Sequence, residues 1–201
     1  MKDFTVYDFS TGAIVSVGIC QDEEFNNQVT NGLSIIEGHY SADKYYFSDG
    51  IAVLKPTYPG DDNDWDAIQK NWKFNKQAAK QRLKKKVERE RVRRDLVDII
   101  YDGKNLQADE EARANIHGKL AEIVAAQALG QTASPLIWRD SDNIIHSWTD
   151  MLAYKEWMQG LVMAIAARGT ALYQSSWAHK AALQALDTAS EIKNYDITTG
   201  W

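Results

Sequence analysis

The chain has 201 residues, enough for one or two domains, and its content of 44% hydrophobic and 25% charged residues is typical of a globular protein. Its single cysteine, Cys20, excludes an intrachain disulfide. We expect no signal peptide and no membrane segment, because the N-terminal sequence is polar and no apolar run approaches the roughly 18 residues that span a bilayer.

The formal net charge of −5 conceals three blocks of different sign. Residues 1–66 carry three basic and twelve acidic side chains, whereas residues 67–95 carry twelve basic and three acidic ones. Residues 96–201 carry eight basic and thirteen acidic side chains. About half of all Lys and Arg therefore lie in one short segment, and such a block marks an exposed element or an interaction surface.

Residues 1–55 are predicted to form a small β-rich module. Alternating residues at 4–8, the turn sequence Ser10-Thr11-Gly12 and the apolar run 13–19 indicate a hairpin. A short helix over 22–28 with Asp22 as its N-cap follows, and further strands are predicted at 33–37, 45–47 and 51–54. The module is small enough to be marginally stable alone, so we expect it to lean on a neighbour or a partner chain.

Residues 56–66 are predicted to be a linker, because two prolines and a glycine prevent regular structure. A helix is predicted from Trp65 to about residue 100, with Asp64 as its N-cap and its basic part at 67–95, because this stretch contains no Gly or Pro. Trp65, Ile68 and Trp72 would form one apolar stripe on it. A second, looser stripe would contain Leu83, Val87, Leu96 and Ile99. The middle of this helix is almost wholly charged, so we expect it to bridge two domains or to pack in an oligomer.

Residues 96–193 are predicted to form a helical domain with two β-hairpins. The Asp102-Gly103 pair indicates a hairpin of strands 99–101 and 104–107, and Asp109 is the predicted N-cap of a helix over 110–129 that ends at Gly130. A second hairpin is predicted from strands 136–139 and 144–148. Thr149 would cap a last helix that runs to about residue 189, and residues 194–201 would be an extended tail. The predicted buried face of the first helix consists of Ile116, Leu120, Ile123 and Val124. The fold class is therefore α+β.

Four tryptophans, Trp138, Trp148, Trp157 and Trp177, fall on the second hairpin and the last helix. They are predicted to form one aromatic core between these elements. The alternative is a recognition surface for another protein, since large aromatic residues favour interfaces as well as cores.

The basic residues Lys84, Lys85, Lys86, Arg91, Arg93 and Arg94 admit three interpretations. They could be a solvated helix face, a contact for an acidic protein surface, or a set of phosphate contacts for nucleic acid. No groove-reading motif accompanies them and the whole chain is acidic, with a pI near 5.4, so we expect no nucleic-acid partner.

No catalytic or cofactor-binding pattern is present in the sequence. The four histidines, His39, His117, His146 and His179, have no metal-ligand spacing, and no histidine lies near Cys20 to activate it. Asp61, Asp62, Asp64 and Asp66 could supply oxygens to a calcium ion, but helix capping explains them equally well and the glutamate of an EF-hand loop is missing. We expect neither an enzyme nor a bound metal or cofactor.

Several short motifs occur in a fixed order in the second half of the chain. They are Arg93-Arg94-Asp95, Tyr101-Asp102-Gly103, Gln107-Ala108-Asp109, Arg113-Ala114-Asn115-Ile116, the stretch WRDSDN at 138–143, Trp148-Thr149-Asp150-Met151 and LYQSSWAHK at 172–180. In this order they resemble a domain of unassigned activity that recurs at the C-terminal end of tailed-bacteriophage tail proteins and tail-fibre assembly proteins. A shorter match, in the N-terminal module, resembles the first module of many phage tail proteins.

This resemblance implies a structural tail protein that links the tail or baseplate to a tail fibre or receptor-binding protein. The alternatives are a tail-fibre assembly chaperone and a nucleic-acid-binding phage protein that uses the basic helix. We expect other tail or fibre proteins as partners, a homo-oligomer, and a location in the virion tail, with the host cytoplasm as the site of assembly. The predicted partner-binding residues are Trp65, Ile68, Trp72, Lys84, Lys85, Lys86, Arg91, Arg93 and Arg94.

Overall fold

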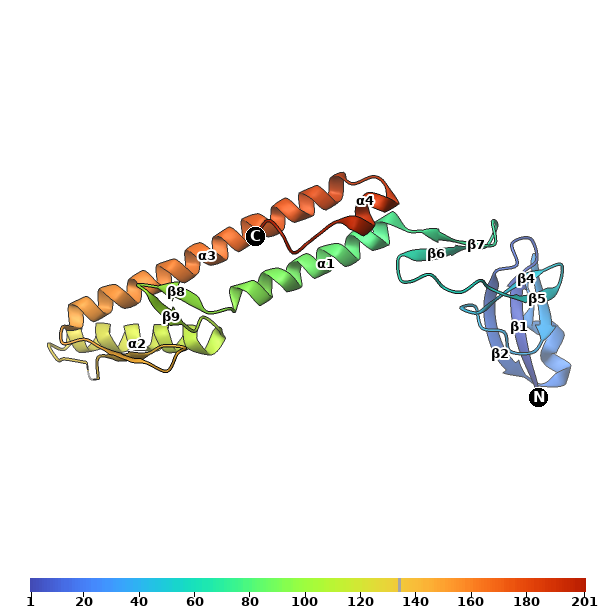
Figure 1. The fold of residues 1–201 in the computed structure, drawn as a ribbon. Helices are drawn as coiled ribbons and strands as arrows, with labels where there is room; N and C mark the ends of the chain where they lie inside the picture. The colour runs from blue at the N-terminus through green and yellow to red at the C-terminus, as the bar shows by residue number, and fades with distance from the viewer. Residues whose placement is uncertain (134) are drawn as a thin grey trace. The chain divides into compact units, whose positions relative to one another are not determined.

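The computed structural model describes residues 1–133 and 135–201 and has the predicted α+β fold (Figure 1). The chain divides into two compact units, Met1–Ala79 and Lys80–Trp201, each described here by itself. The division falls inside a helix, α1 (Lys76–Asp95). The basic segment from Lys80 onward is therefore part of the C-terminal unit.

The N-terminal unit is built on a three-stranded antiparallel sheet in the order β2-β1-β3. These strands are β1 (Lys2–Asp8), β2 (Ile14–Cys20) and β3 (Leu33–Glu37), with the 3₁₀ helix η1 (Asp22–Gln28) between the last two. One face of the sheet buries Phe4, Val6 and Cys20 against η1 and β3. The predicted strands and the short helix are confirmed, although Gln21 rather than Asp22 holds the N-cap position.

A hairpin of β4 (Tyr45–Ser48) and β5 (Ile51–Leu54) belongs to the same unit. The ring of Phe47 is buried and stacks on Tyr7 of β1, with 4.1 Å between ring centroids. The Phe47 amide also donates to the Gly12 carbonyl oxygen at 2.9 Å. Gly12 has a φ of +70°, and a Cβ there would collide with the Phe47 carbonyl, so only glycine fits this contact.

The predicted start of the long helix is wrong. Residues Trp65 to Phe74 belong instead to a hairpin of β6 (Asn63–Asp66) and β7 (Asn71–Phe74), in which Trp65 pairs with Trp72. The turn is held by Asp66, whose Oδ1 accepts from the amides of Ile68 and Gln69 at 2.9 and 2.8 Å. A cross-strand aromatic pair and an Asx turn therefore outweigh helix propensity in this segment.

Helix α1 begins after Asn75, which serves as its N-cap in place of the predicted Asp64. The Asn75 Oδ1 accepts from the Ala78 amide at 2.9 Å, whereas Asp64 lies on β6. An asparagine side chain at this position satisfies one of the amides that the first helical turn leaves unpaired. The helix ends at Asp95, where the basic segment was predicted to end.

The C-terminal unit contains two hairpins and three further helices. The hairpins are β8 (Ile99–Tyr101) with β9 (Lys104–Leu106), and β10 (Ile137–Arg139) with β11 (Ile145–Ser147). The helices are α2 (Glu110–Ala128), α3 (Met151–Ala185) and α4 (Ala189–Asn194). Both predicted hairpins and the Asp109 cap of α2 are confirmed.

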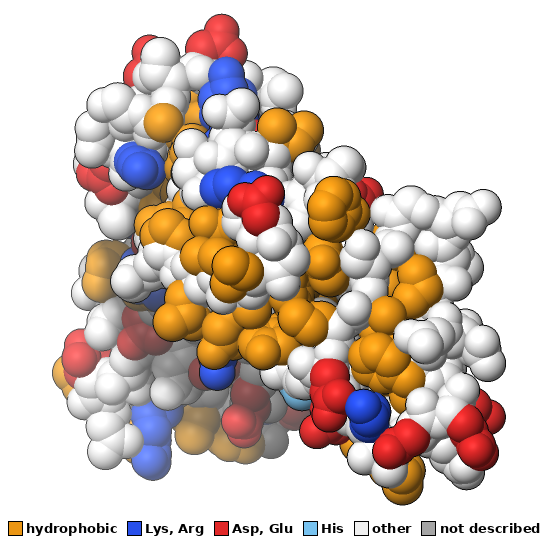
Figure 2. All heavy atoms as spheres, turned by 90° about the vertical axis from the view of Figure 1, so that its right-hand side faces the viewer, with side chains coloured by type: hydrophobic (Ala, Val, Ile, Leu, Met, Phe, Trp, Pro, Cys, Tyr) orange, Lys and Arg blue, Asp and Glu red, His pale blue; other side chains and the backbone are white. Residues whose placement is uncertain are grey.

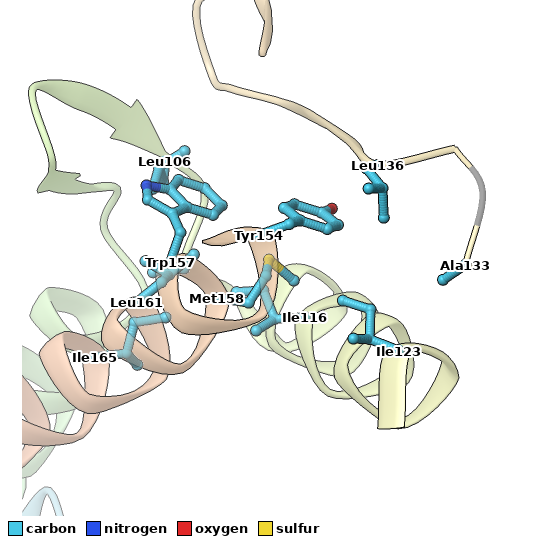
Figure 3. Close-up of a cluster of buried hydrophobic side chains, with 11 residues drawn as sticks. Leu106, Ile116, Ile123, Ala133, Leu136, Tyr154, Trp157, Met158, Leu161 and Ile165 are labelled. Carbon is cyan, nitrogen blue, oxygen red and sulfur yellow. The ribbon is translucent and has the colours of Figure 1, made fainter. Parts of the chain in front are cut away.

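The main core of this unit lies between α2, the first half of α3 and the two hairpins (Figure 3). The ring of Tyr154 is fully buried, and its hydroxyl donates to the Ile137 carbonyl oxygen at 2.7 Å. The Trp148 ring lies 4.7 Å from each of the Tyr154 and Trp157 rings. The predicted aromatic core is thus present, with Trp138 packed against it.

Four details of the prediction for this unit are wrong. Trp177 is 62% exposed and takes no part in the core, and Val124 is half exposed on α2. Asp150, rather than Thr149, caps α3, with its Oδ1 accepting from the Leu152 amide at 3.0 Å. The last helix ends at Ala185 because Thr188 and Glu191 form a capping box that starts α4.

The second half of α3 lies beside α1 (Figure 1). Lys80 and Lys84 of α1 donate to the backbone and side-chain oxygens of Gln184 at 2.9 and 3.0 Å, and Glu88 forms an ion pair with Lys180. Val87 of α1 is fully buried. Polar contacts therefore hold α1 to α3 within its own chain. That the helix bridges two domains or packs in an oligomer stays a prediction.

The C-terminal residues pack on this unit and do not form a free arm. Tyr195 Oη lies 2.8 Å from His179 Nδ1, and the Trp201 ring lies 4.9 Å from the His179 ring. Arg94 of α1 donates to the Thr198 carbonyl oxygen at 2.9 Å. The segment after α4 therefore connects α1 to α3.

Candidate interaction surfaces

Trp65 and Trp72, two of the predicted partner-binding residues, form an aromatic cluster with their own unit. Their rings lie 5.3 Å apart, and Tyr46 and Tyr58 contact them at 5.2 and 4.8 Å respectively. The Trp72 indole nitrogen donates to the Pro56 carbonyl oxygen at 2.9 Å. These contacts hold the β6–β7 hairpin against the residues that precede it in the sequence. Both tryptophans therefore stabilise the N-terminal unit itself, whether or not they also contact a partner.

A lysine completes this cluster. The Lys55 ammonium lies 4.7 Å from the centre of the Trp65 ring and 5.4 Å from that of Trp72, and it donates to the Ala42 carbonyl oxygen at 2.6 Å. Burial among these groups lowers the pKa of Lys55. A groove of about 380 Å³ opens beside it and is lined in part by Tyr58 and Trp72.

Ile68, the third residue of the predicted stripe, lies in the turn of the same hairpin and is 75% exposed. A second hollow, of about 600 Å³, lies beside the hairpin and contains Trp65 and Ile68 in its lining. The structure thus keeps the three residues together, although on a hairpin turn and its strands and not along a helix. Of the three, only Ile68 is free to contact another molecule with its whole side chain.

An exposed apolar strand edge in the same unit was not predicted as a site. Strand β2 is an outer strand of its sheet, and the side chains of Val15, Val17 and Ile19 on it are 57%, 38% and 61% exposed. The strand carries no charge and no proline, the features that protect most edge strands from pairing. Hydrophobic side chains also gather on the face that Figure 2 turns to the viewer, without those of β2 being singled out in it. The alternation of valine and isoleucine was visible in the sequence, but the sequence did not reveal that the strand is at an edge.

Only part of the predicted basic surface of α1 is paired with its own glutamates, since the helix carries ten basic and three acidic side chains. Arg93 and Arg94 both contact Glu90, at 2.7 and 2.8 Å, and Arg91 contacts Glu88 at 3.1 Å. The hydrogen bond from Arg93, together with that from Arg94, lowers the pKa of Glu90 to about 2. These arginines therefore present ion pairs to the solvent instead of unopposed positive charge.

The three predicted lysines differ in whether they have a partner within the protein. Lys84 is bound to Gln184 of α3, whereas Lys85 and Lys86 are exposed. Arg91 also stacks on a tyrosine, with its guanidinium carbon 4.1 Å from the centre of the Tyr173 ring. Of the six predicted basic residues, Lys84, Arg91 and Arg94 thus contact residues outside α1, Arg93 pairs within the helix, and Lys85 and Lys86 are exposed.

The end of α1 is held by two arginines from other helices. Arg113 of α2 donates to the Asp95 carboxylate at 3.0 Å and to the Asp95 carbonyl oxygen at 2.6 Å. Arg168 of α3 donates to the carbonyl oxygens of Asp95, Val97 and Asp98 at 2.7, 2.6 and 3.2 Å. The last carbonyls of a helix have no partners within it, and two guanidinium groups satisfy that of Asp95, while Arg168 also binds the turn that follows. This clamp gives the Arg-Arg-Asp motif and the later arginine motif a structural role.

Within residues 1–133 and 135–201, no group of three or more His, Cys, Asp or Glu side chains is placed to hold a metal ion. Asp64 and Asp66 have protein partners, Asn75 and Lys73 respectively. Asp140 accepts a hydrogen bond from His146 at 2.8 Å, which lowers the pKa of the carboxyl group. Cys20 is buried. That the chain is not an enzyme stays a prediction.

Over the same described part of the chain, no helix is both long enough and apolar enough to cross a membrane.

Residues 78–199, more than half of the chain, match the model of a family described as a domain of unknown function (DUF4376). The chain belongs to this family. The DUF4376 segment and the C-terminal unit have the same bounds to within two residues at each end, so the family domain is this folded unit, including most of α1. No curated protein and no solved structure matches the chain.

The clamp residues Asp95, Arg113 and Arg168 and the core residues of Figure 3 all lie within the DUF4376 domain. Most of the motifs noted in the sequence therefore build the domain: they end α1, form the first hairpin and cap α2. The surfaces open to other molecules lie elsewhere, on β2, on the turn that contains Ile68 and on the outer side of α3.

Proposed function

We propose that this protein is a structural component of a bacteriophage tail, and that it links the tail or baseplate to a tail fibre or receptor-binding protein. The ordered series of motifs from Arg93 to Lys180, which resembles the C-terminal domain of such proteins, leads to this proposal. A linking protein needs two separately folded parts, each with a surface for a different neighbour. The division into a β-rich unit and a DUF4376 unit fits that need.

The observation that carries the linking role is the bare β2 edge. An uncharged edge strand with three exposed apolar side chains is a risk for a free protein, because it pairs readily with other strands. The risk disappears when the edge is covered in an assembly. We propose that another tail protein covers it, by adding a strand or by packing an apolar surface on Val15, Val17 and Ile19.

A test of the proposal is quantitative mass spectrometry of purified particles of the phage that encodes the protein. A tail component should be present at a fixed number of copies per particle. A protein that is abundant in the lysate but missing from finished particles would instead be an assembly chaperone, the alternative function, and the proposal would fail.

A second test addresses the edge itself. Val17→Lys places a charge in the middle of β2 without burying it, so the protein should fold but enter particles at a much lower level. Ile145→Lys, at a similarly exposed position on β11, is the matched control and should enter at the normal level. Normal incorporation of the Val17→Lys protein would exclude β2 as the attachment site.

A further inference from the structure

The outer side of α3 carries no charge along most of its length. Every exposed residue of this helix from Gln159 to Ala185 is uncharged, and half of them are alanine. Since 25% of the whole chain is charged, a solvated helix face of this length should carry several charges. The face is about 33 Å long between Met163 and Gln184, at 1.5 Å per residue.

Two large apolar side chains project from this face. Met163 is 69% exposed and Trp177 is 62% exposed, and Thr170 lies halfway between them, seven residues from each. Residues seven apart lie on nearly the same side of a helix, which is the spacing of a helix-pairing seam. The alanines around them allow a second helix to approach closely.

Helix α1 lies along one side of the second half of α3 (Figure 1), and Met163 and Trp177 are exposed on another side. Tyr173 borders the face on the α1 side, 6.2 Å from Trp177 and under the Arg91 guanidinium. The ion pair between Glu88 and Lys180 also lies on that side. The contacts of Arg91 and Lys180 with the neighbouring helix are thus on the α1 side and not on this face.

We propose that this face binds the same face of a second copy, with the two α3 helices antiparallel and Thr170 at the two-fold axis. In that arrangement Trp177 of one copy lies level with Met163 of the other, a large ring beside a flexible thioether. A parallel arrangement would place the two Trp177 rings against each other and hold the two helices apart at the smaller side chains. The proposal concerns the DUF4376 unit and does not depend on the role in a phage tail.

The positions of charged residues near the two ends of the face also favour the antiparallel arrangement. Glu156 is exposed at the N-terminal end of the face and has no ion-pair partner among the described residues. Antiparallel pairing about Thr170 brings it level with Gln184 of the second copy, whose side chain is bound to the Lys84 ammonium at 3.0 Å. The contact occurs twice in the dimer. Parallel pairing would place each Lys84 level with the other and each Glu156 level with the other, with repulsion at both ends.

The first measurement is sedimentation equilibrium of the full-length chain. We expect a dimer at micromolar concentration, and Trp177→Glu should raise the dissociation constant at least about 30-fold, as for a central tryptophan of an interface. Val124→Glu, a change of similar chemistry at a half-exposed position on α2, should have no effect. A monomeric wild-type chain, or a dimer that is indifferent to Trp177→Glu, overturns the proposal. Circular dichroism of each variant verifies that the helices are intact.

The second measurement is cysteine cross-linking, which reports the direction. Gln159→Cys and Ala181→Cys are both exposed on the face and lie at equal distances in sequence from Thr170. An oxidised mixture of the two variants should give the mixed disulfide dimer, whereas each variant alone should give little. Cys20 is buried and should not interfere. Efficient cross-linking of each variant with itself would show a parallel pair and overturn the arrangement.

Discussion

At the scale of single residues, the charge of α1 is organised by two glutamates. Glu88 and Glu90 lie one or two turns from the end of the helix, and between them they engage Arg91, Arg93, Arg94 and Lys180. A count of lysines and arginines along the segment does not reveal this, because pairing at a spacing of three or four residues depends on the register of each glutamate. The sequence showed the charge block but not which of its arginines pair with glutamates.

Glu90 gives the C-terminal unit a dependence on acid pH. Its folded pKa of about 2 lies below its ordinary value of 4.5, so its ion pairs stabilise the fold fully above pH 4.5 and are lost as the pH falls toward 2. We expect Glu90→Gln to lower the melting temperature at pH 7, and the difference from the wild type to vanish near pH 2. Circular dichroism melts between pH 2 and 7 measure it.

The control for this experiment is Glu23→Gln, an exposed glutamate in the other unit with no ion pair among the described residues. It should leave the melting temperature unchanged across the same range. An effect of Glu90→Gln that persists unchanged at pH 2 would mean that the loss comes from helix packing and not from the charge of Glu90.

At the scale of elements, most strands and helices follow from local signals. Asp102-Gly103 specifies the first hairpin of the C-terminal unit and Asp109 specifies the start of α2, because both act through neighbouring backbone groups. The hairpin of β6 and β7 was missed because its signals compete with a helix pattern. Trp65, Ile68 and Trp72 have helical spacing as well as strand pairing, and only the Asx turn at Asp66 decides between them.

Two glycines inside helices have opposite environments. A Cβ on Gly118 of α2 would meet no atom within 4 Å, whereas a Cβ on Gly160 of α3 would collide with the hydroxyl of Tyr101. Gly118→Ala should therefore raise the free energy of unfolding by about 0.5–1 kcal/mol, through helix propensity alone. Gly160→Ala should lower it by about 1–3 kcal/mol, because the added methyl group overpacks the contact with β8. Urea denaturation of both variants measures these changes.

The double variant Gly160→Ala, Tyr101→Phe separates the cause. Removing the hydroxyl relieves the closest contact, so part of the loss should be recovered. If Tyr101→Phe and Gly160→Ala instead add as independent losses, the clash with the hydroxyl is not the reason for the glycine.

At the scale of the whole molecule, the sequence predicted the fold class and the kinds of exposed surface. It predicted less well where those surfaces lie. The α+β fold and the β-rich first part were correct. The contact of α1 with α3 joins residues about 100 apart, such as Lys84 and Gln184, and no local pattern encodes it. The same holds for the clamp on Asp95, and for the exposure of β2, which depends on the order of strands in its sheet.

The distribution of charge over the whole chain predicts weak binding to nucleic acid. The net charge of the chain is −5, and three basic residues of α1, Arg91, Arg93 and Arg94, are paired with glutamates, which weakens the attraction of this helix for phosphate. We expect no submicromolar binding of mixed-sequence duplex or single-stranded DNA at about 150 mM salt in a gel-shift titration. Tight binding that disappears on charge reversal of these three arginines would support the nucleic-acid alternative instead.

The clamp on Asp95 also orders events in time. The carbonyl oxygen of Asp95, at the end of α1, accepts from Arg113, 18 residues later, and from Arg168, 73 residues later. During synthesis the end of α1 leaves the ribosome long before Arg168 does. The last turn of this helix is therefore open to water until most of α3 has been made. All residues of the N-terminal unit, Met1–Ala79, have been made by then. Translation therefore completes the β-rich unit first and the DUF4376 unit only near the end of the chain.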